Sequence, residues 1–174
     1  MATAPAFAAD PLCFQIKTAV LAAMKRPFHI FIEENRTYDS ATHAKGAPTP
    51  GPAGSRSFEE IFTGSASFIQ VRGKWQRSPV SFSDVEKDRT DDPDAKEVAQ
   101  HEKCAVLADE AVGGEAASVY DLRNPSLGVA TRMWISKSRR LPLKATVTTD
   151  VGTAKTVSSL RYDYTNVRPP PGVK

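Results

Sequence analysis

The stretch Arg132–Val147, RMWISKSRRLPLKATV, decides how the second half of the chain folds. It gathers a tryptophan and several basic residues around a Leu-Pro pair, so it is either a basic patch for an acidic partner or a turn between two strands. Ser138 and Pro142 favour turns, and strand-like segments flank them on both sides. The stretch therefore predicts a β-hairpin whose basic residues lie at an exposed end, where charged groups keep their hydration.

This hairpin belongs to a longer run of predicted strands. Turn signals at Gly113-Gly114, Asn124-Pro125 and Gly152 separate apolar segments of similar length. In the last segment Leu160 and Tyr162 alternate with polar residues, a period typical of a sheet with one wet face. The expected strands cover 98–112, 116–122, 129–137, 143–151 and 156–167. Short connections of this kind predict an antiparallel meander.

A helix and a strand are predicted ahead of the meander. Asp10 as cap, Pro11 in the first turn and Pro27 as terminator predict an amphipathic helix between them. Its apolar positions, three to four residues apart, are Cys13, Ile16, Val20 and Met24. That face should pack on a sheet. The next segment, FHIFIEENRTY at 28–38, is rich in aromatic and β-branched residues and predicts a strand.

The region between this strand and the meander is less regular. Asp39–Gly54 consists largely of Ala, Pro, Gly, Thr and Ser without periodicity, which predicts a long loop, either poorly ordered or an irregular flap. Short strand-like segments follow up to Val80, with a tight hairpin at Arg72-Gly73. A short surface helix is expected at 83–89.

Composition limits the class of protein. A chain of 174 residues suits one core, so a single domain is expected over 10–168, with a tail at 169–174. No apolar run approaches the roughly 18 residues of a membrane-spanning helix. The net charge is +3, and the 20 acidic residues are interspersed among the 23 basic ones. This disfavours nucleic-acid binding, which usually needs a cluster of Lys and Arg.

The N-terminus and the two cysteines indicate a compartment. Residues 1–9 end in an A-x-A-type signature and are expected to be the remnant of a signal peptide, with an arbitrary N-terminal segment as the alternative. In an exported chain, Cys13 and Cys104 permit one disulfide that ties the first helix to the sheet. In a cytosolic protein the same residues would be buried thiols. The favoured location is the periplasm or the outside of the cell.

Segments spread over most of the chain resemble the LolA-like superfamily of bacterial envelope proteins, which includes outer-membrane lipoprotein carriers, and most of all its uncharacterised secreted members. The matching segments are 25–38, 59–79 (EEIFTGSASFIQVRGKWQRSP), 108–120 (ADEAVGGEAASVY), 133–143 and 161–167. The resemblance implies an α+β fold: a curved antiparallel β-sheet, or open half-barrel, with one N-terminal helix and short helices packed on the concave face. No motif for handing over a lipoprotein is found.

The resemblance implies a periplasmic carrier for a lipophilic ligand, a lipid or a lipoprotein acyl chain, held between the first helix and the concave face. The residues expected to line that site are Val20, Met24, Ile30, Ile32, Phe68, Trp75, Trp134, Tyr162 and Tyr164. The alternative is a non-enzymatic envelope module with a filled core, which binds a protein partner or has a structural role.

Catalysis is not expected. The sequence has neither a G-x-S-x-G elbow nor a P-loop, and its histidines and cysteines lack the spacing of a metal site. The adjacent carboxylates Glu33-Glu34 and Glu59-Glu60 should point to opposite faces of their strands, so neither pair can act on one substrate from one side. No cofactor and no metal are expected.

Overall fold

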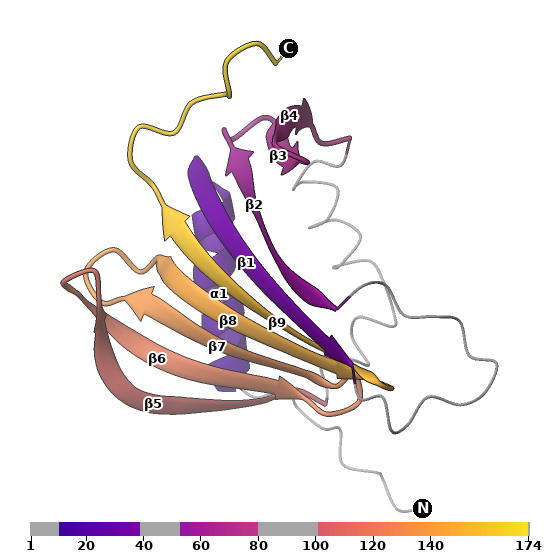
Figure 1. Cartoon of the computed structure of the whole chain (residues 1–174). Coiled ribbons are helices and arrows are strands. Elements are labelled where there is room, and N and C mark those ends of the chain that lie inside the picture. Colours follow the sequence, from indigo (N-terminus) through magenta and orange to yellow (C-terminus); the bar gives the residue numbers. More distant parts are fainter. Residues whose placement is uncertain (1–10, 39–52, 80–100, 174) are drawn as a thin grey trace, which may run out of the picture.

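The computed structural model describes residues 11–38, 53–79 and 101–173. Within them lie one helix and a nine-stranded sheet with the strand order β4-β3-β2-β1-β9-β8-β7-β6-β5. The elements are α1 (Pro11–Met24), β1 (Phe28–Tyr38), β2 (Gly54–Phe62), β3 (Ser67–Val71), β4 (Lys74–Arg77), β5 (Lys103–Val112), β6 (Glu115–Asn124), β7 (Val129–Ser136), β8 (Pro142–Val151) and β9 (Ala154–Asp163). Every neighbouring pair of these strands is antiparallel, and the sheet is curved and does not close (Figure 1).

The predicted helix, first strand and five-stranded meander are confirmed. Arg72-Gly73 and Gly113-Gly114 form two-residue turns with φ of 52° and 75°, and of 59° and 84°, as the twist of such hairpins requires. The last strand ends at Asp163, four residues before the predicted end at Val167. There the Asp163 carboxylate accepts hydrogen bonds from the amide and hydroxyl of Thr165, which turns the chain away from the sheet.

Two predicted features fall outside the described residues. One is the short helix at 83–89, and with it the short helices expected on the concave face. The other is the loop at Asp39–Gly54, of which only the last two positions are described, and Gly54 already begins β2. The structure therefore confirms the helix and the curved antiparallel sheet, and leaves the additional helices as predictions.

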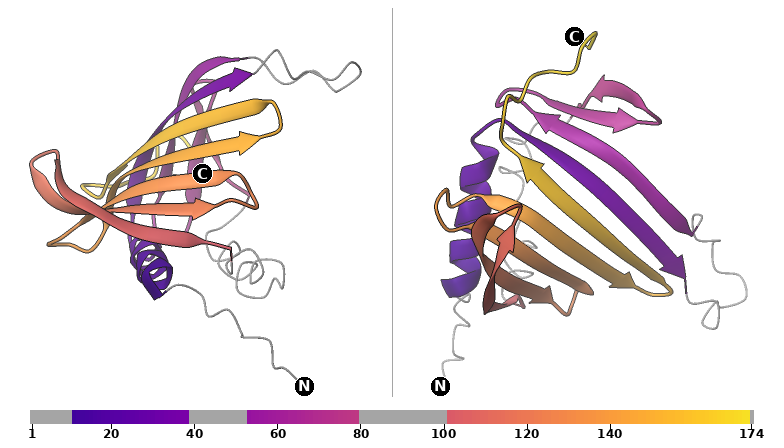
Figure 2. Two further views of the ribbon diagram at one scale, coloured as in Figure 1. Left: turned by 90° about the horizontal axis from the view of Figure 1, so that it is seen from below. Right: turned by 60° about the vertical axis from the view of Figure 1, so that its left-hand side comes forward.

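Helix α1 covers one face of the sheet, as both views in Figure 2 show. Its Ile16 is 1% exposed and packs against Met133, Ile135 and Ala145 of β7 and β8. A second cluster on the same face joins Phe28 and Ile30 of β1 with neighbouring side chains of β2 and β9. We call this side the helix face and the other side the opposite face. Both of these clusters belong to the core on the helix face.

A disulfide joins α1 to the edge strand β5, as the sequence predicted. Cys13 and Cys104 have Cα atoms 5.4 Å apart, and Cys13 is buried under the helix. Beside the disulfide, the Lys17 ammonium lies 2.6 Å from a carboxylate oxygen of Glu102. Among the described residues β5 is the last strand of the sheet and pairs with β6 alone, so the disulfide gives this edge strand a second attachment.

The basic cluster at 137–140 is a turn, which confirms the hairpin interpretation. Arg139 donates two hydrogen bonds to the Glu115 carboxylate, and Lys137 pairs with Asp109. The hydrogen bonds from Arg139 and Ser136 lower the pKa of Glu115 to about 2. The turn between β7 and β8 is thus tied to the β5–β6 hairpin, and two of its basic side chains are paired with acids of this chain.

Candidate ligand-binding site

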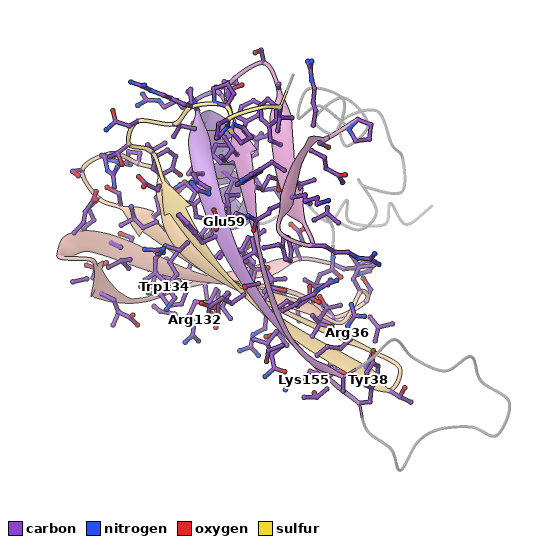
Figure 3. The ribbon with its side chains drawn as sticks, turned by 45° about the horizontal axis from the view of Figure 1, so that its top comes forward. Arg36, Tyr38, Glu59, Arg132, Trp134 and Lys155 are labelled. Atoms are coloured by element: carbon purple, nitrogen blue, oxygen red, sulfur yellow. A yellow bond between two sulfur atoms is a disulfide. The ribbon has the colours of Figure 1, made fainter. Side chains whose placement is uncertain are left out.

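A row of side chains crosses the opposite face of the sheet. Trp134, Lys144, Arg161, Phe31 and Glu59 stand directly opposite one another on β7, β8, β9, β1 and β2. Because neighbouring residues of a strand point to opposite faces and Met133 contacts α1, Trp134 and its cross-strand partners point away from the helix. Figure 3 labels Trp134 and Glu59 at the two ends of this row.

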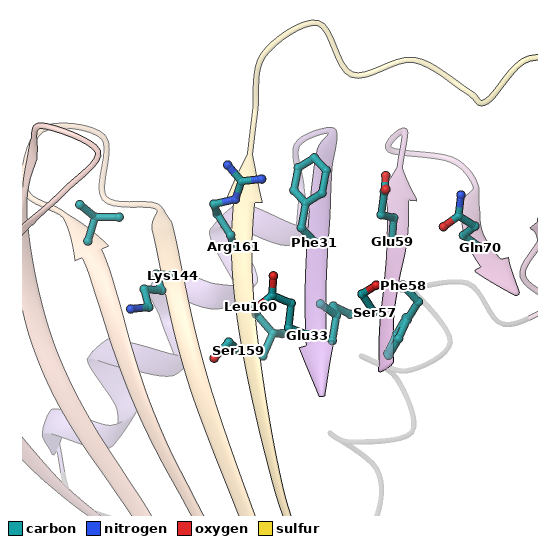
Figure 4. A pocket seen from close by; sticks show the side chains of 12 residues that line it. Phe31, Glu33, Ser57, Phe58, Glu59, Gln70, Lys144, Ser159, Leu160 and Arg161 are labelled. Carbon is teal, nitrogen blue, oxygen red and sulfur yellow. The ribbon is translucent and has the colours of Figure 1, made fainter. Parts of the chain in front are cut away.

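A pocket of about 430 Å³ lies along the row. Strands β1, β2 and β9 supply most of its wall, and Gln70 of β3, Val112 of β5 and Lys144 of β8 complete it (Figure 4). The apolar side chains that face the pocket are those of Phe31 and Val112, whereas Phe58 and Leu160 border the wall from strand positions whose side chains point to the helix face. The volume falls within the range of roughly 300 to 1,000 Å³ that is usual for small-molecule sites.

Two cations of the pocket lie over aromatic rings. The Lys144 ammonium is 4.6 Å from the ring centre of Trp134, and the Arg161 guanidinium carbon is 4.5 Å from that of Phe31. Trp134 and Phe31 are on the outer sides of this pair of strands, so the two cations lean away from each other. Neither cation forms an ion pair with a carboxylate in the ranges that the structure describes.

Most of the acidic side chains near the row have hydrogen-bond partners within this chain. The Glu59 carboxylate lies 2.8 Å from Nε2 of His29, whose ring contacts that of Phe31 at a tilt of 31° with centres 4.1 Å apart. Hydrogen bonds from Thr165 lower the pKa of Asp163, and the charges of His29 and Arg161 act in the same direction. Glu33, also in the pocket wall, is exposed.

The adjacent carboxylates of β1 and β2 point to opposite faces, as predicted. Glu33 lines the pocket, whereas Glu34 accepts a hydrogen bond of 2.9 Å from Arg56. Glu59 meets His29 on the opposite face, while Glu60 stands across from the buried Ile30, and burial raises its pKa. Neither pair presents two carboxylates to one ligand.

The residues that the sequence predicted as a ligand wall are divided between the two faces. Val20, Ile30, Ile32, Tyr162 and Tyr164 belong to clusters of the helix face, whereas the strand register places Phe68, Trp75 and Trp134 on the opposite face. The side chain of Met24 is outside the described part of the molecule. Of the nine, Ile32 alone is among the residues that line the pocket.

Packed side chains fill the described contact between α1 and the sheet. Ile16 is almost fully buried there, and burial raises the pKa of Tyr162 to about 12. The Tyr164 hydroxyl donates a hydrogen bond of 2.8 Å to the carbonyl oxygen of Pro142. These side chains have structural partners, and the pocket lies on the other side of the sheet.

Sequence reasoning missed the main residues of the pocket. Phe31 carried a usable signal, because it is an aromatic residue at a position that strand alternation assigns to the face away from Ile30 and Ile32. Lys144 and Arg161 carried none, because their proximity depends on the register between β8 and β9.

The described residues hold neither a metal-binding cluster nor a membrane-spanning helix. Within 11–38, 53–79 and 101–173, no three His, Cys, Asp or Glu side chains are grouped as a metal ion would require. None of the helical segments in those ranges is long and apolar enough to cross a membrane.

No family model and no curated protein matches the chain. Solved structures do match. The lipoprotein LppX of Mycobacterium tuberculosis is 11% identical with a TM-score of 0.45, over 92% of this chain and 99% of LppX. LprF of Mycobacterium bovis is 12% identical with a TM-score of 0.46, over 94% and 98% of the two chains. A putative outer membrane lipoprotein-sorting protein domain from Vibrio parahaemolyticus is 9% identical with a TM-score of 0.32, over 94% and 93%. At these identities and TM-scores the likeness concerns the fold alone.

Proposed function

We propose that this chain is a non-catalytic binding protein, or carrier, for a lipophilic ligand such as the acyl chain of a lipid or lipoprotein. The observation that carries the proposal is the pocket of about 430 Å³ on the opposite face, where Phe31 and Val112 offer apolar surface beside polar groups. An acyl chain that leaves water for such a surface gains about 0.8 kcal/mol for each methylene that it buries.

The chemistry of the pocket wall favours binding over catalysis. A nucleophilic serine needs a base within hydrogen-bond reach. Ser57 and Ser159 line the pocket, but neither hydroxyl is hydrogen-bonded to His29 in the described part of the chain, where His29 pairs with Glu59. The proposed function therefore includes no reaction and no cofactor.

The disulfide supports a location outside the cytosol. A bond between Cys13 and Cys104 persists in oxidising compartments and is rare where thiols are kept reduced. We place the protein in the periplasm or outside the cell, where a carrier of lipophilic cargo would shield that cargo from water.

A second candidate function, an interaction module of the envelope, has one observation in its favour. Phe14 and Leu21 on α1 are 70% and 37% exposed, and Val106 on the edge strand β5 is 59% exposed. An edge strand can accept a strand from a partner protein. This candidate needs no ligand in the pocket.

Filling the pocket tests the carrier function. Ser159→Trp is expected to weaken binding of a fluorescent fatty-acid probe by about tenfold or more, because the indole occupies the space where the chain would lie. Ser158→Trp is the matched control, since Ser158 is the next residue of β9 and points to the helix face. Fluorescence titration gives the affinities, and thermal unfolding shows whether each variant is folded.

Two results would contradict the carrier function. One is a wild-type protein that fails to bind the probe. The other is a folded Ser159→Trp variant with the affinity of the wild type. Either result would favour the interaction module.

A further inference from the structure

Lys144 and Arg161 form a like-charged pair in the centre of the sheet. They stand directly opposite each other on β8 and β9. Like charges in this position destabilise a sheet, whereas opposite charges stabilise it. Elsewhere in the same sheet Arg132 pairs with its cross-strand partner Asp121 at 2.8 Å. The formation of the sheet therefore does not explain two cations at these positions.

No carboxylate of the described chain neutralises the pair. Glu59 is engaged by His29, and Asp163 accepts hydrogen bonds from Thr165, although its charge is close enough to sense Arg161. The two cations are instead placed over the rings of Trp134 and Phe31. A cation–π contact orients a cation and leaves N–H donors available, because lysine has three such donors and arginine five.

A second pair of like charges, on β5 and β6, provides a comparison for Lys144 and Arg161. Lys103 and Arg123 are cross-strand neighbours on β5 and β6, and both are exposed. Arg123 lies 3.6 Å from Asp121, so its charge has a partner, and neither residue lines the 430 Å³ pocket. Lys144 and Arg161 combine uncompensated positive charge with a position in the pocket wall.

We propose that Lys144 and Arg161 receive the anionic headgroup, a carboxylate or a phosphate, of an amphiphile whose apolar chain lies against Phe31 and Val112. The inference rests on the proposed function and narrows its ligand to anionic amphiphiles. Hydrogen bonds from ammonium and guanidinium groups to a carboxylate or phosphate are charge-assisted and stronger than neutral ones. The same wall holds two carboxylates, the exposed Glu33 and Glu59, which pairs with His29, and their negative charge would weaken anion binding.

The test compares three dodecyl amphiphiles that differ in the headgroup: dodecanoate, dodecyl phosphate and neutral dodecanol. Each amphiphile is kept below its own critical micelle concentration. Its affinity is measured by the displacement of a bound, uncharged fluorescent probe. For the wild type we expect the tighter of the two anions to bind at least about tenfold better than dodecanol. In Lys144→Gln/Arg161→Gln this preference should fall to about twofold or less, while dodecanol binds as before. The comparison of dodecanoate with dodecyl phosphate shows whether the headgroup is a carboxylate or a phosphate.

Two further variants serve as controls. Lys103→Gln/Arg123→Gln makes the same change of charge at a cross-strand pair outside the pocket and should keep the preference for anions. Glu33→Gln removes one of the two opposing charges and should strengthen anion binding without changing dodecanol binding.

The outcomes separate the inference from the function on which it rests. If dodecanol and the anions bind the wild type equally, or if the double variant at Lys144 and Arg161 keeps the preference, the headgroup inference is wrong and the carrier function stands. If none of the three amphiphiles binds, both are wrong. If the control double variant loses the preference equally, the effect is that of net charge, and the assignment to these two residues is wrong.

Discussion

Replacing Cys13 and Cys104 with serine is expected to lower the free energy of unfolding by about 4 to 5 kcal/mol, because a bond across this long loop restricts the unfolded chain. The two cysteines are 91 residues apart in the sequence. The bond also fixes α1 to β5, which pairs with β6 alone in the part of the chain that the structure describes. Urea unfolding of the oxidised wild type and of the double variant gives the difference.

The reduced wild type is the control for this substitution. It keeps both sulfur atoms and loses only the bond, so its stability should come close to that of the serine variant. Cys13 is buried, and any further loss in the variant measures the packing of its side chain. A difference below about 1 kcal/mol between the oxidised and reduced wild type would contradict the predicted role of the disulfide.

Truncating Phe28 is expected to cost about 3 to 5 kcal/mol, the range for a buried phenylalanine changed to alanine. Phe28 is 2% exposed, and its ring centre lies 5.2 Å from that of Phe62 and 6.2 Å from that of Tyr162. Phe28→Ala removes these contacts and leaves a cavity on the helix face. Denaturant unfolding measures the loss.

Phe14→Ala is the matched control, because it removes the same side chain from a site that is 70% exposed. We expect this variant to stay within about 0.5 kcal/mol of the wild type, as surface substitutions usually do. If both variants lost the same free energy of unfolding, the Phe14 side chain would have to be buried in solution, and its 70% exposure in the structure would be contradicted.

Much of the fold could be predicted because short-range signals mark its turns. Gly113-Gly114 and Arg72-Gly73 supply the left-handed conformations that a two-residue hairpin needs, and alternation within 28–38 marks the buried side of β1. Pro11 and Pro27 flank the segment that forms α1. Each of these signals lies within a few residues of the feature that it predicts.

The candidate site could not be predicted in the same way. Its central row depends on how β1 pairs with β9 and β8 with β7, and these registers bring together residues far apart in the sequence. Alternation divides the residues of one strand between two faces. It does not show which residues of another strand lie on the same side of the sheet. For this reason the predicted wall combined Ile30 of the helix face with Trp75 and Trp134 of the opposite face.

The central claim is that a lipophilic ligand binds on the opposite face, in the pocket along Phe31 and Val112. Isotope-filtered NOE measurements on isotope-labelled protein with unlabelled dodecanoate test it most directly, because an NOE requires ligand and side chain to be in contact. The account predicts NOEs from the ligand methylenes to Phe31 and Val112, with none to Ile16 or Met133 of the contact between α1 and the sheet. NOEs to Ile16 and Met133 without any to the pocket, or no intermolecular NOEs, would contradict it.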